Sequence, residues 1–154
     1  MRTAGLILFV IGSAASFGWL LAYLQVPTAA VEALTAVADN KYIVLLLMMI
    51  ALLILGTFMD LAPLIIICTP IFLPVAKAFG IDPVHFGVIL ILNAGIGLIT
   101  PPVGSVLFVG TAIGNISVTD ALRSIWPFYI ASFVVLLLVV YVPQLSLWLP
   151  AVLK

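Results

Sequence analysis

The residues that could do chemistry in this chain are oxygen donors beside glycines and prolines. One stretch is Asn93-Ala-Gly95-Ile-Gly97-Leu-Ile-Thr100-Pro101-Pro102-Val103-Gly104, and another is Gly56-Thr-Phe-Met-Asp60. Pro101 and Pro102 remove two backbone donors and disfavour helix at the residues before them, so nearby carbonyls lose helical partners. A hard cation such as Na⁺ prefers oxygen ligands. The two stretches therefore predict a cation site of carbonyls, the Thr100 hydroxyl and the Asn93 amide.

The helix expected after Pro102 should attract an anion, in contrast to the carbonyls, which attract a cation. Its first N–H groups are free and lie at the positive end of the helix dipole, which favours an anion. Unwound backbone inside a membrane is the arrangement that ion-coupled transporters use, because freed carbonyls replace water around a cation. The alternative is a membrane scaffold that transports nothing and in which the breaks are only kinks, since glycine and proline are frequent in membrane helices.

Side chains for enzyme catalysis are sparse. An intramembrane hydrolase needs a nucleophile and a base, for which Ser105 and His85 are the candidates. Ser105 lies outside a GxSxG motif, and Asp60 alone among the carboxylates lies in the middle of an apolar stretch, so an aspartyl dyad is missing. Cys68 is the single cysteine, which excludes an intrachain disulfide and a thiolate metal cluster. We predict that the chain is not an enzyme.

The composition is that of a membrane protein. Apolar residues make up 66% of the 154 residues and charged residues 6%, against roughly 25% charged residues in a soluble domain. The five basic residues are far apart and the net charge is zero, which excludes nucleic acid as a partner. Trp126 and Trp148 are placed like anchors at the membrane interface.

The hydropathy pattern predicts an all-α integral membrane protein with about three spanning helices, one of them broken at Gly95–Pro102, plus a re-entrant helical hairpin. All belong to one membrane domain, 1–154, with a helix over 3–25, the hairpin over 41–78, the broken helix over 83–116 and a helix over 121–143. A short interfacial helix is expected over Val31–Val37. Asp82 and Pro83 are a typical N-cap and first helical residue.

Two interpretations of 41–78 compete, namely two complete helices or a re-entrant hairpin whose tip stops inside the bilayer. A first arm over Lys41–Leu55 would be about 22 Å long, short of a hydrocarbon core of about 30 Å, which favours the re-entrant form. Asp60 at the tip costs a few kcal/mol in lipid and should face protein or water. It is either part of the site or an N-cap of the second arm. The charges by themselves fix no orientation.

The order of these motifs resembles the C-terminal half of the large membrane subunit of TRAP transporters, the tripartite ATP-independent periplasmic family. The motifs are Gly56-Thr-Phe-Met-Asp60, Thr69-Pro-Ile-Phe-Leu-Pro74, Gly80-Ile-Asp-Pro-Val-His-Phe-Gly87, Asn93 and Gly97-Leu-Ile-Thr-Pro-Pro-Val-Gly104. The resemblance covers nearly the whole chain. It implies one repeat of an inverted-repeat fold that moves as an elevator, with a hairpin over Lys41–Lys77 that opens to the periplasm.

The resemblance also implies a function, which is sodium-coupled import of organic acids such as C4-dicarboxylates or sialic acid. The implied partners are a small TRAP membrane subunit, a periplasmic substrate-binding protein and the N-terminal half of the large subunit, in a bacterial inner membrane that the chain crosses several times. Na⁺ is the coupling ion and no other cofactor is implied. The sodium site implied by similarity uses Gly56, Gly97, Thr100 and Val103, with Asn93 and Asp60 in support.

The chain departs from the family in its length. The family's first repeat has no counterpart here, so half of the organic-acid site is missing. We therefore expect either a fragment or a chain that pairs with a separate first half. A third possibility is an ion-coupled carrier that needs no binding-protein partner.

Overall fold

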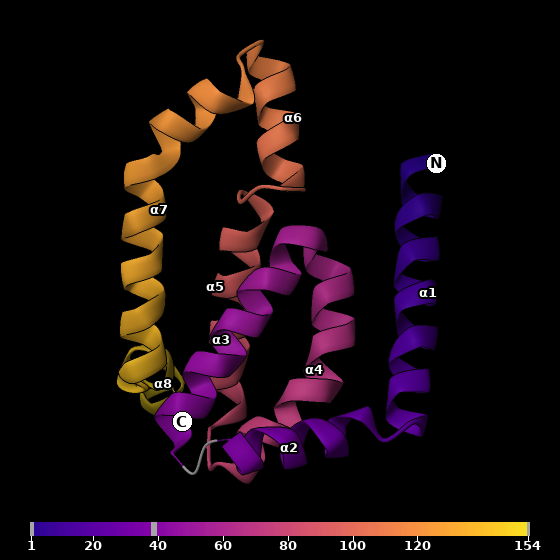
Figure 1. Ribbon diagram of the computed structural model, residues 1–154, viewed down its shortest axis with the longest axis vertical. Coiled ribbons are helices and arrows are strands. Elements are labelled where there is room, and N and C mark those ends of the chain that lie inside the picture. Colours follow the sequence, from indigo (N-terminus) through magenta and orange to yellow (C-terminus); the bar gives the residue numbers. More distant parts are fainter. Residues whose placement is uncertain (1, 38–39, 154) are drawn as a thin grey trace.

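The computed structural model describes residues 2–37 and 40–153, and these residues form an all-helical chain, as predicted. The helices are α1 (Arg2–Tyr23), α2 (Val26–Val37), α3 (Lys41–Phe58), α4 (Leu61–Ala78), α5 (Pro83–Leu98), α6 (Ser105–Gly114), α7 (Val118–Tyr141) and α8 (Gln144–Val152). In Figure 1, α5 and α6 form the central column, with α7 on one side, α4 and α1 on the other, and α3 crossing in front of α5. The core lies mainly between α3 and α5.

Local sequence signals set where several helices begin. The Asp82 side chain accepts a hydrogen bond from the Val84 N–H at 2.7 Å, and Pro83 is the first residue of α5. Asn40 accepts one from the Tyr42 N–H at 2.9 Å, and Ser117 accepts one from the Asp120 N–H at 3.1 Å. Each cap satisfies an N–H that has no intrahelical acceptor. The predicted roles of Asp82 and Pro83 are confirmed.

The N-terminal part bends sharply after its first helix. The axes of α1 and α2 differ by 63° across a break at residues 24–25, where Gln25 has a positive φ of 55°. The helix predicted over Val31–Val37 is longer and begins at Val26. It lies across the end of the molecule where the α3–α4 hairpin opens (Figure 1). This orientation is expected of a helix at the membrane interface rather than one that crosses it.

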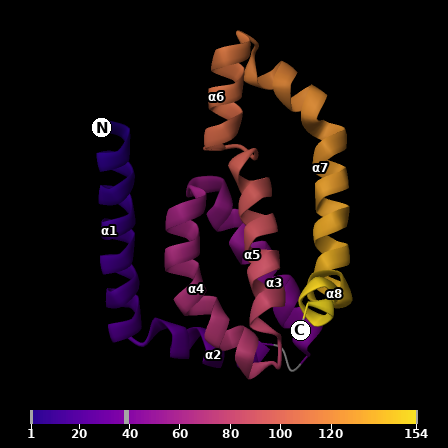
Figure 2. The ribbon, with the colours of Figure 1, turned by 180° about the vertical axis from the view of Figure 1, so that it is seen from behind.

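The arms of the hairpin are longer than predicted. Both α3 and α4 have 18 residues, or about 27 Å at 1.5 Å per residue, close to the hydrocarbon core of about 30 Å. The first arm continues beyond Leu55 to Phe58, where the Met59 N–H closes the last turn by bonding to the Leu55 carbonyl at 3.0 Å. Arm length therefore does not distinguish the two interpretations, because each arm alone is long and apolar enough to cross a membrane. Figures 1 and 2 show the turn near the depth of the α5–α6 break, while α6 and α7 extend farther, which favours the re-entrant form.

The break between α5 and α6 begins later in the sequence than predicted. It covers 99–104, whereas Gly95 and Gly97 are both in α5. Pro101 and Pro102 lack the N–H groups that would bond to the carbonyls four residues earlier, so their effect begins at Gly97 and not before. The Gly97 carbonyl instead accepts the Thr100 N–H at 2.9 Å. The prediction of unwound backbone from Gly95 onward is therefore wrong, although a break is present.

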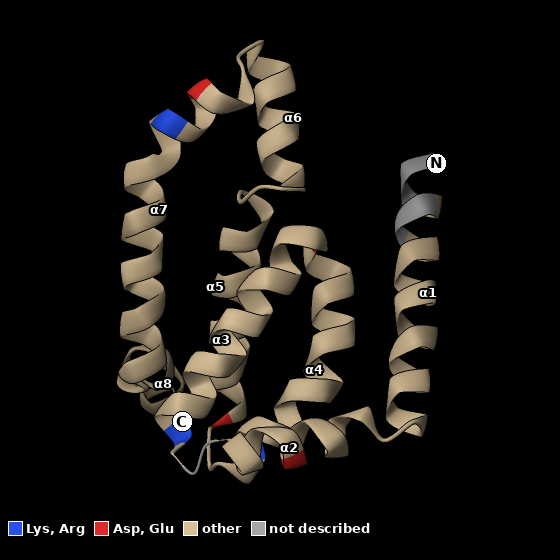
Figure 3. Ribbon diagram, in the orientation of Figure 1, with Lys and Arg blue, Asp and Glu red and all other residues tan. Residues whose placement is uncertain are grey.

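Charged residues lie near the two ends of the described structure (Figure 3). One end carries Asp120 and Arg123 in the first turns of α7, and the other carries Lys41, Lys77 and Asp82 at the ends of α3, α4 and α5. Asp60 differs because it lies at the turn between α3 and α4. This segregation of charge is what a bilayer requires, and it leaves Asp60 as a carboxylate at the depth of the helix break.

Candidate functional site

The hairpin tip and the last turn of α5 meet at two buried glycines. A Cβ added to Gly97 would lie 2.6 Å from the Gly56 carbonyl oxygen and 2.7 Å from the Gly56 Cα. A Cβ added to Gly56 would lie 3.4 Å from the Gly97 Cα, which is nearly ordinary contact. Only hydrogen fits on Gly97, so the two backbones approach directly. This contact places a carbonyl of α3 against the helix that leads into the break.

Asn93 lies one turn before Gly97 and is fully buried. Its Nδ2 donates to the Ile89 carbonyl at 2.9 Å. Its Oδ1 has no hydrogen-bond partner within the described residues. An unmade hydrogen bond of a buried polar atom costs about 1–3 kcal/mol. The orphan amide oxygen is therefore a candidate cation ligand, next to the place where α3 and α5 are closest.

Thr100 lies one turn after Gly97, inside the break. Its Oγ1 donates to the Ile96 carbonyl at 2.6 Å, which leaves the lone pairs of that oxygen for another group. No described N–H bonds to the carbonyls of Thr100 or Val103. Val103 is 45% exposed on the outer part of the break. The structure thus brings Gly56 against Gly97 and Asn93, whereas Thr100 lies in the break and lines a groove beside α7.

Asp60 joins the hairpin tip to α6. It occupies the N-cap position of α4, but its side chain makes no capping bond. Asp60 Oδ1 instead accepts a hydrogen bond from Ser105 Oγ at 2.6 Å, across 45 residues of sequence. The interpretation of Asp60 as a simple cap is therefore wrong, because Ser105 competes for the carboxylate. This bond holds the start of α6 beside the hairpin tip. Gly104, at the N-cap position of α6, supplies no capping side chain.

The nucleophile and base considered for an enzyme do not pair. Ser105 bonds to Asp60, whereas His85 is buried near the start of α5 with its Nδ1 3.1 Å from Ser146 Oγ of α8. No cluster of three or more His, Cys, Asp and Glu side chains suited to a metal occurs in 2–37 and 40–153. The oxygen donors at the tip and the break are therefore carbonyls, hydroxyls and the Asn93 amide, with Asp60 as the carboxylate at the tip.

Tyr129 is a contributor that the sequence did not reveal. Its hydroxyl, from α7, donates to the carbonyl of Ile99, the first residue of the break. The two residues are 30 positions apart, and an isolated tyrosine in an apolar helix carries no signal of such a bond. The bond satisfies one carbonyl that the break frees, so it fixes which carbonyls stay open.

We expect Tyr129→Phe to lower the free energy of unfolding by about 1–3 kcal/mol, because the half-buried Ile99 carbonyl loses its donor. Unfolding by SDS titration in mixed micelles measures the change. Tyr141→Phe is the matched control, since the Tyr141 ring is partly exposed and packs beside Tyr42. Equal stability of the Tyr129→Phe variant and the wild type would show that the bond contributes nothing.

The long apolar helices and the interruptions within them define an all-helical membrane protein. Residues 1–145 match the family described as the DctM component of the tripartite ATP-independent periplasmic transporter. The chain belongs to this family, whose permeases are transporters and not enzymes. It is a multi-pass inner-membrane protein, in agreement with its long apolar helices.

Curated relatives match along nearly the whole chain. The protein YgiK of Salmonella typhimurium is 47% identical over 96% of this chain and 34% of its own length. The sialic acid TRAP transporter large permease protein SiaM of Vibrio cholerae is 39% identical, over 97% of this chain and 35% of its own length. The 2,3-diketo-L-gulonate TRAP transporter large permease protein YiaN of Escherichia coli is 35% identical, over 94% and 34%. The chain thus spans about a third of the length of these relatives.

Proposed function

We propose that this chain forms the cation-binding repeat of a sodium-coupled transporter that imports organic acids. The observation that carries the proposal is the backbone contact of Gly56 with Gly97, beside the unpaired Oδ1 of the fully buried Asn93. A monovalent cation placed there would receive carbonyl oxygen from α3, amide oxygen from Asn93 and hydroxyl oxygen from Thr100. Such ligands replace the hydration shell of a hard ion without a carboxylate cluster.

The substrate class follows from charge and from the relatives. SiaM and YiaN are named for sialic acid and 2,3-diketo-L-gulonate, and a further relative from Pseudomonas aeruginosa, 39% identical, is named for C4-dicarboxylates. All of these are carboxylates. The N-terminus of α6 favours negative charge near the hairpin tip, where the Asp60 carboxylate already bonds to Ser105. We infer that a carboxylate of the substrate binds between these elements and the rest of the large subunit.

The partners belong to the same proposal. Because the chain spans about a third of its relatives, we propose that the N-terminal part of a large subunit supplies the other half of the substrate site. A small TRAP membrane subunit and a periplasmic substrate-binding protein would complete the system. Uptake of a labelled organic acid into proteoliposomes, with and without a Na⁺ gradient and with each partner omitted in turn, tests the whole assembly. Uptake that needs no binding protein would favour a simple ion-coupled carrier.

Thr100→Val tests the cation site in the isolated chain. We expect the purified wild type to unfold at a higher temperature in Na⁺ than in K⁺ at equal ionic strength, because an ion that binds the folded state stabilises it by RT ln(1 + [L]/Kd). Thr100→Val should lose most of this difference, since valine keeps the shape and removes the oxygen.

Thr111→Val is the matched control for that experiment. Thr111 also donates to a carbonyl of its own helix, that of Phe108 at 3.0 Å, but it lies in α6, beyond the break. Its variant should keep the full Na⁺ response. An unchanged Na⁺ response in Thr100→Val would remove Thr100 from the site. A wild type that does not distinguish Na⁺ from K⁺ would indicate either a non-transporting scaffold or a chain that needs its other half, and co-expression with the N-terminal part of a large subunit would separate the two.

A further inference from the structure

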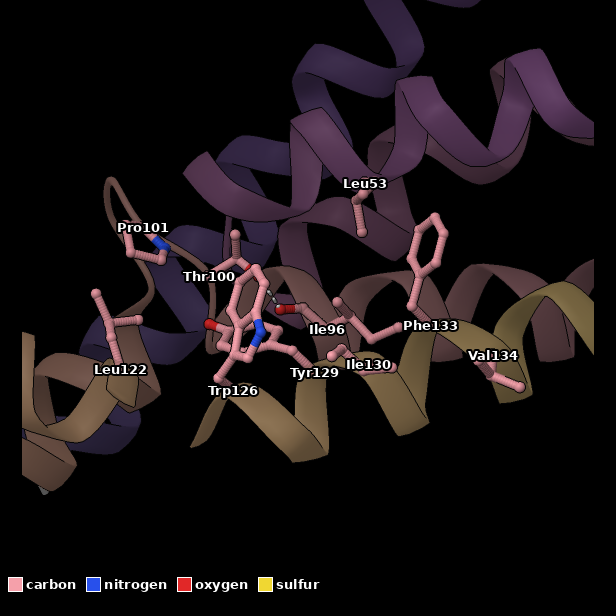
Figure 4. A pocket seen from close by; sticks show the side chains of 10 residues that line it. All are labelled: Leu53, Ile96, Thr100, Pro101, Leu122, Trp126, Tyr129, Ile130, Phe133 and Val134. Atoms are coloured by element: carbon pink, nitrogen blue, oxygen red, sulfur yellow. Dashed lines mark hydrogen bonds between the residues drawn. The ribbon is translucent and has the colours of Figure 1, made fainter. Parts of the chain in front are cut away.

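An apolar groove of about 600 Å³ runs along α7 on the side that faces α3 and the helix break (Figure 4). Leu122, Trp126, Phe133 and Val134 line it from α7, Leu53 lines it from α3, and Thr100 lies at its inner wall. The side chains of Trp126 and Phe133 are 64% and 39% exposed. The groove is therefore open to the surroundings of a membrane protein along an apolar face.

The mouth of this groove carries a positive charge. A second hollow of about 330 Å³ is lined by Thr119, Leu122, Arg123 and Trp126, so it shares two of its residues with the groove. Arg123 is exposed. The nearby acid, Asp120, keeps its negative charge, but its carboxylate is turned to the start of α7, where it accepts a hydrogen bond from Ser117 Oγ at 2.5 Å. Arg123 thus lines a hollow that adjoins the apolar groove at Leu122 and Trp126.

A bend in α7 shapes the mouth. Pro127 lies inside α7 and cannot bond to the carbonyl four residues earlier, that of Arg123. Proline at such a position kinks a helix. Figures 1 and 2 show the first turns of α7 running obliquely from α6 before the rest of the helix descends beside α5. The oblique turns carry Arg123 and the descending part carries the apolar wall.

The length of the groove agrees with one leaflet of a bilayer. Its lining on α7 runs from Leu122 to Val134, which is about 18 Å at 1.5 Å per residue. Half of a hydrocarbon core of about 30 Å is about 15 Å, the depth that one acyl chain fills. Trp126 lies near the charged end, where tryptophan prefers the interface between headgroups and acyl chains.

We propose that this groove binds one acyl chain of an anionic phospholipid, whose headgroup phosphate pairs with Arg123. Guanidinium groups bind phosphate with directed, charge-assisted hydrogen bonds, and basic pockets beside membrane helices bind lipid headgroups. The Thr119 hydroxyl at the mouth adds a neutral donor for the same phosphate. The bound lipid would pack against α7 on the face from which Tyr129 holds the break, so it would stabilise that arrangement.

Native mass spectrometry of the purified chain tests the charge at the mouth. Phosphatidylglycerol and phosphatidylcholine with identical acyl chains are titrated against the wild type, and we expect about fivefold tighter binding of phosphatidylglycerol, the effect of about one basic residue at an anionic lipid. Arg123→Gln should bind both lipids equally. Lys41→Gln is the control, because Lys41 is exposed at the opposite end of the molecule and does not line the groove.

Filling the groove tests the acyl chain separately. Ile130 lines the groove and is 53% exposed, so Ile130→Trp occupies space without disturbing the core. It should weaken the binding of both lipids several-fold, whereas Ile113→Trp, at a 79% exposed position on α6, should not. A preference for phosphatidylglycerol that survives Arg123→Gln, or lipid binding unchanged by Ile130→Trp, would overturn the proposal. So would loss of association with the N-terminal part of the large subunit in Ile130→Trp while lipid binding is retained, because a protein segment would then occupy the groove.

Discussion

Gly97→Ala should lower the free energy of unfolding by about 3 kcal/mol, at the upper end of what overpacking a close contact costs. The new Cβ would lie 2.6 Å from the Gly56 carbonyl oxygen and 2.7 Å from its Cα. Both are backbone atoms that cannot rotate away, so α3 and α5 must separate. SDS titration in mixed micelles measures the loss. The Na⁺ response should disappear with it, because the separated helices no longer hold the carbonyl and amide oxygens together.

Two other glycine substitutions serve as controls for Gly97→Ala. Gly95 is in the same helix, but a Cβ there meets nothing within 4 Å, so Gly95→Ala should be neutral or stabilise the chain by up to about 1 kcal/mol through helix propensity. Gly56→Ala should be much milder than Gly97→Ala, since its Cβ would lie at 3.4 Å from the nearest atom. If Gly95→Ala and Gly97→Ala destabilised the chain equally, close approach would not be what Gly97 provides.

Asn93→Leu should have opposite effects on stability and on ion binding. In K⁺ the free energy of unfolding should rise by about 1 kcal/mol, because leucine keeps the branched, four-atom side-chain skeleton of asparagine and removes a buried oxygen that lacks a partner, which outweighs the cost of its larger volume. The stabilisation by Na⁺ should vanish, since the amide oxygen is then absent. For the wild type this stabilisation is about 2.7 kcal/mol at an ion concentration of 100 times Kd. Unfolding in Na⁺ and in K⁺ at equal ionic strength measures both effects.

Thr111→Val is the control for Asn93→Leu, because it shows the general effect of removing a buried polar group on stability and on the Na⁺ response. The Thr111 hydroxyl is nearly buried and already bonded to the Phe108 carbonyl, so its loss should not raise stability in K⁺ and should leave the Na⁺ response intact. A lower stability of Asn93→Leu in both salts would mean that the amide oxygen has a structural partner, and it would remove Asn93 from the proposed site.

Three contacts connect the hairpin and α7 to the broken helix. Gly56 packs on Gly97, Asp60 accepts the Ser105 hydroxyl, and Tyr129 donates to the Ile99 carbonyl. The Gly56 contact lies before the break, the Tyr129 bond is at the first residue of the break, and the Asp60 bond is immediately after the break. Because each depends on a different element, the carbonyls of the break are held from several sides. A site built in this way stays ordered although its backbone has left the helix.

The sequence by itself determined the features that depend on local chemistry. Low charge and long apolar stretches required membrane helices, Asp82 with Pro83 set the start of α5, and Pro101 with Pro102 required that a helix end nearby. The order of the motifs sufficed to predict the family, which the match over residues 1–145 confirms. The proposed ligands Gly56, Gly97, Thr100 and Val103 stay a prediction for the ion-binding experiments.

Only the tertiary structure decided which residues meet. Gly95 and Gly97 have the same local propensity, yet one faces open space and the other touches the hairpin backbone. Asp60 satisfies every local requirement of an N-cap but bonds to Ser105, and nothing near Tyr129 in the sequence indicates that it reaches Ile99. The physical reason is that a cap or a proline acts within about one helical turn, whereas these contacts arise from the packing of helices whose residues are 30 to 45 positions apart.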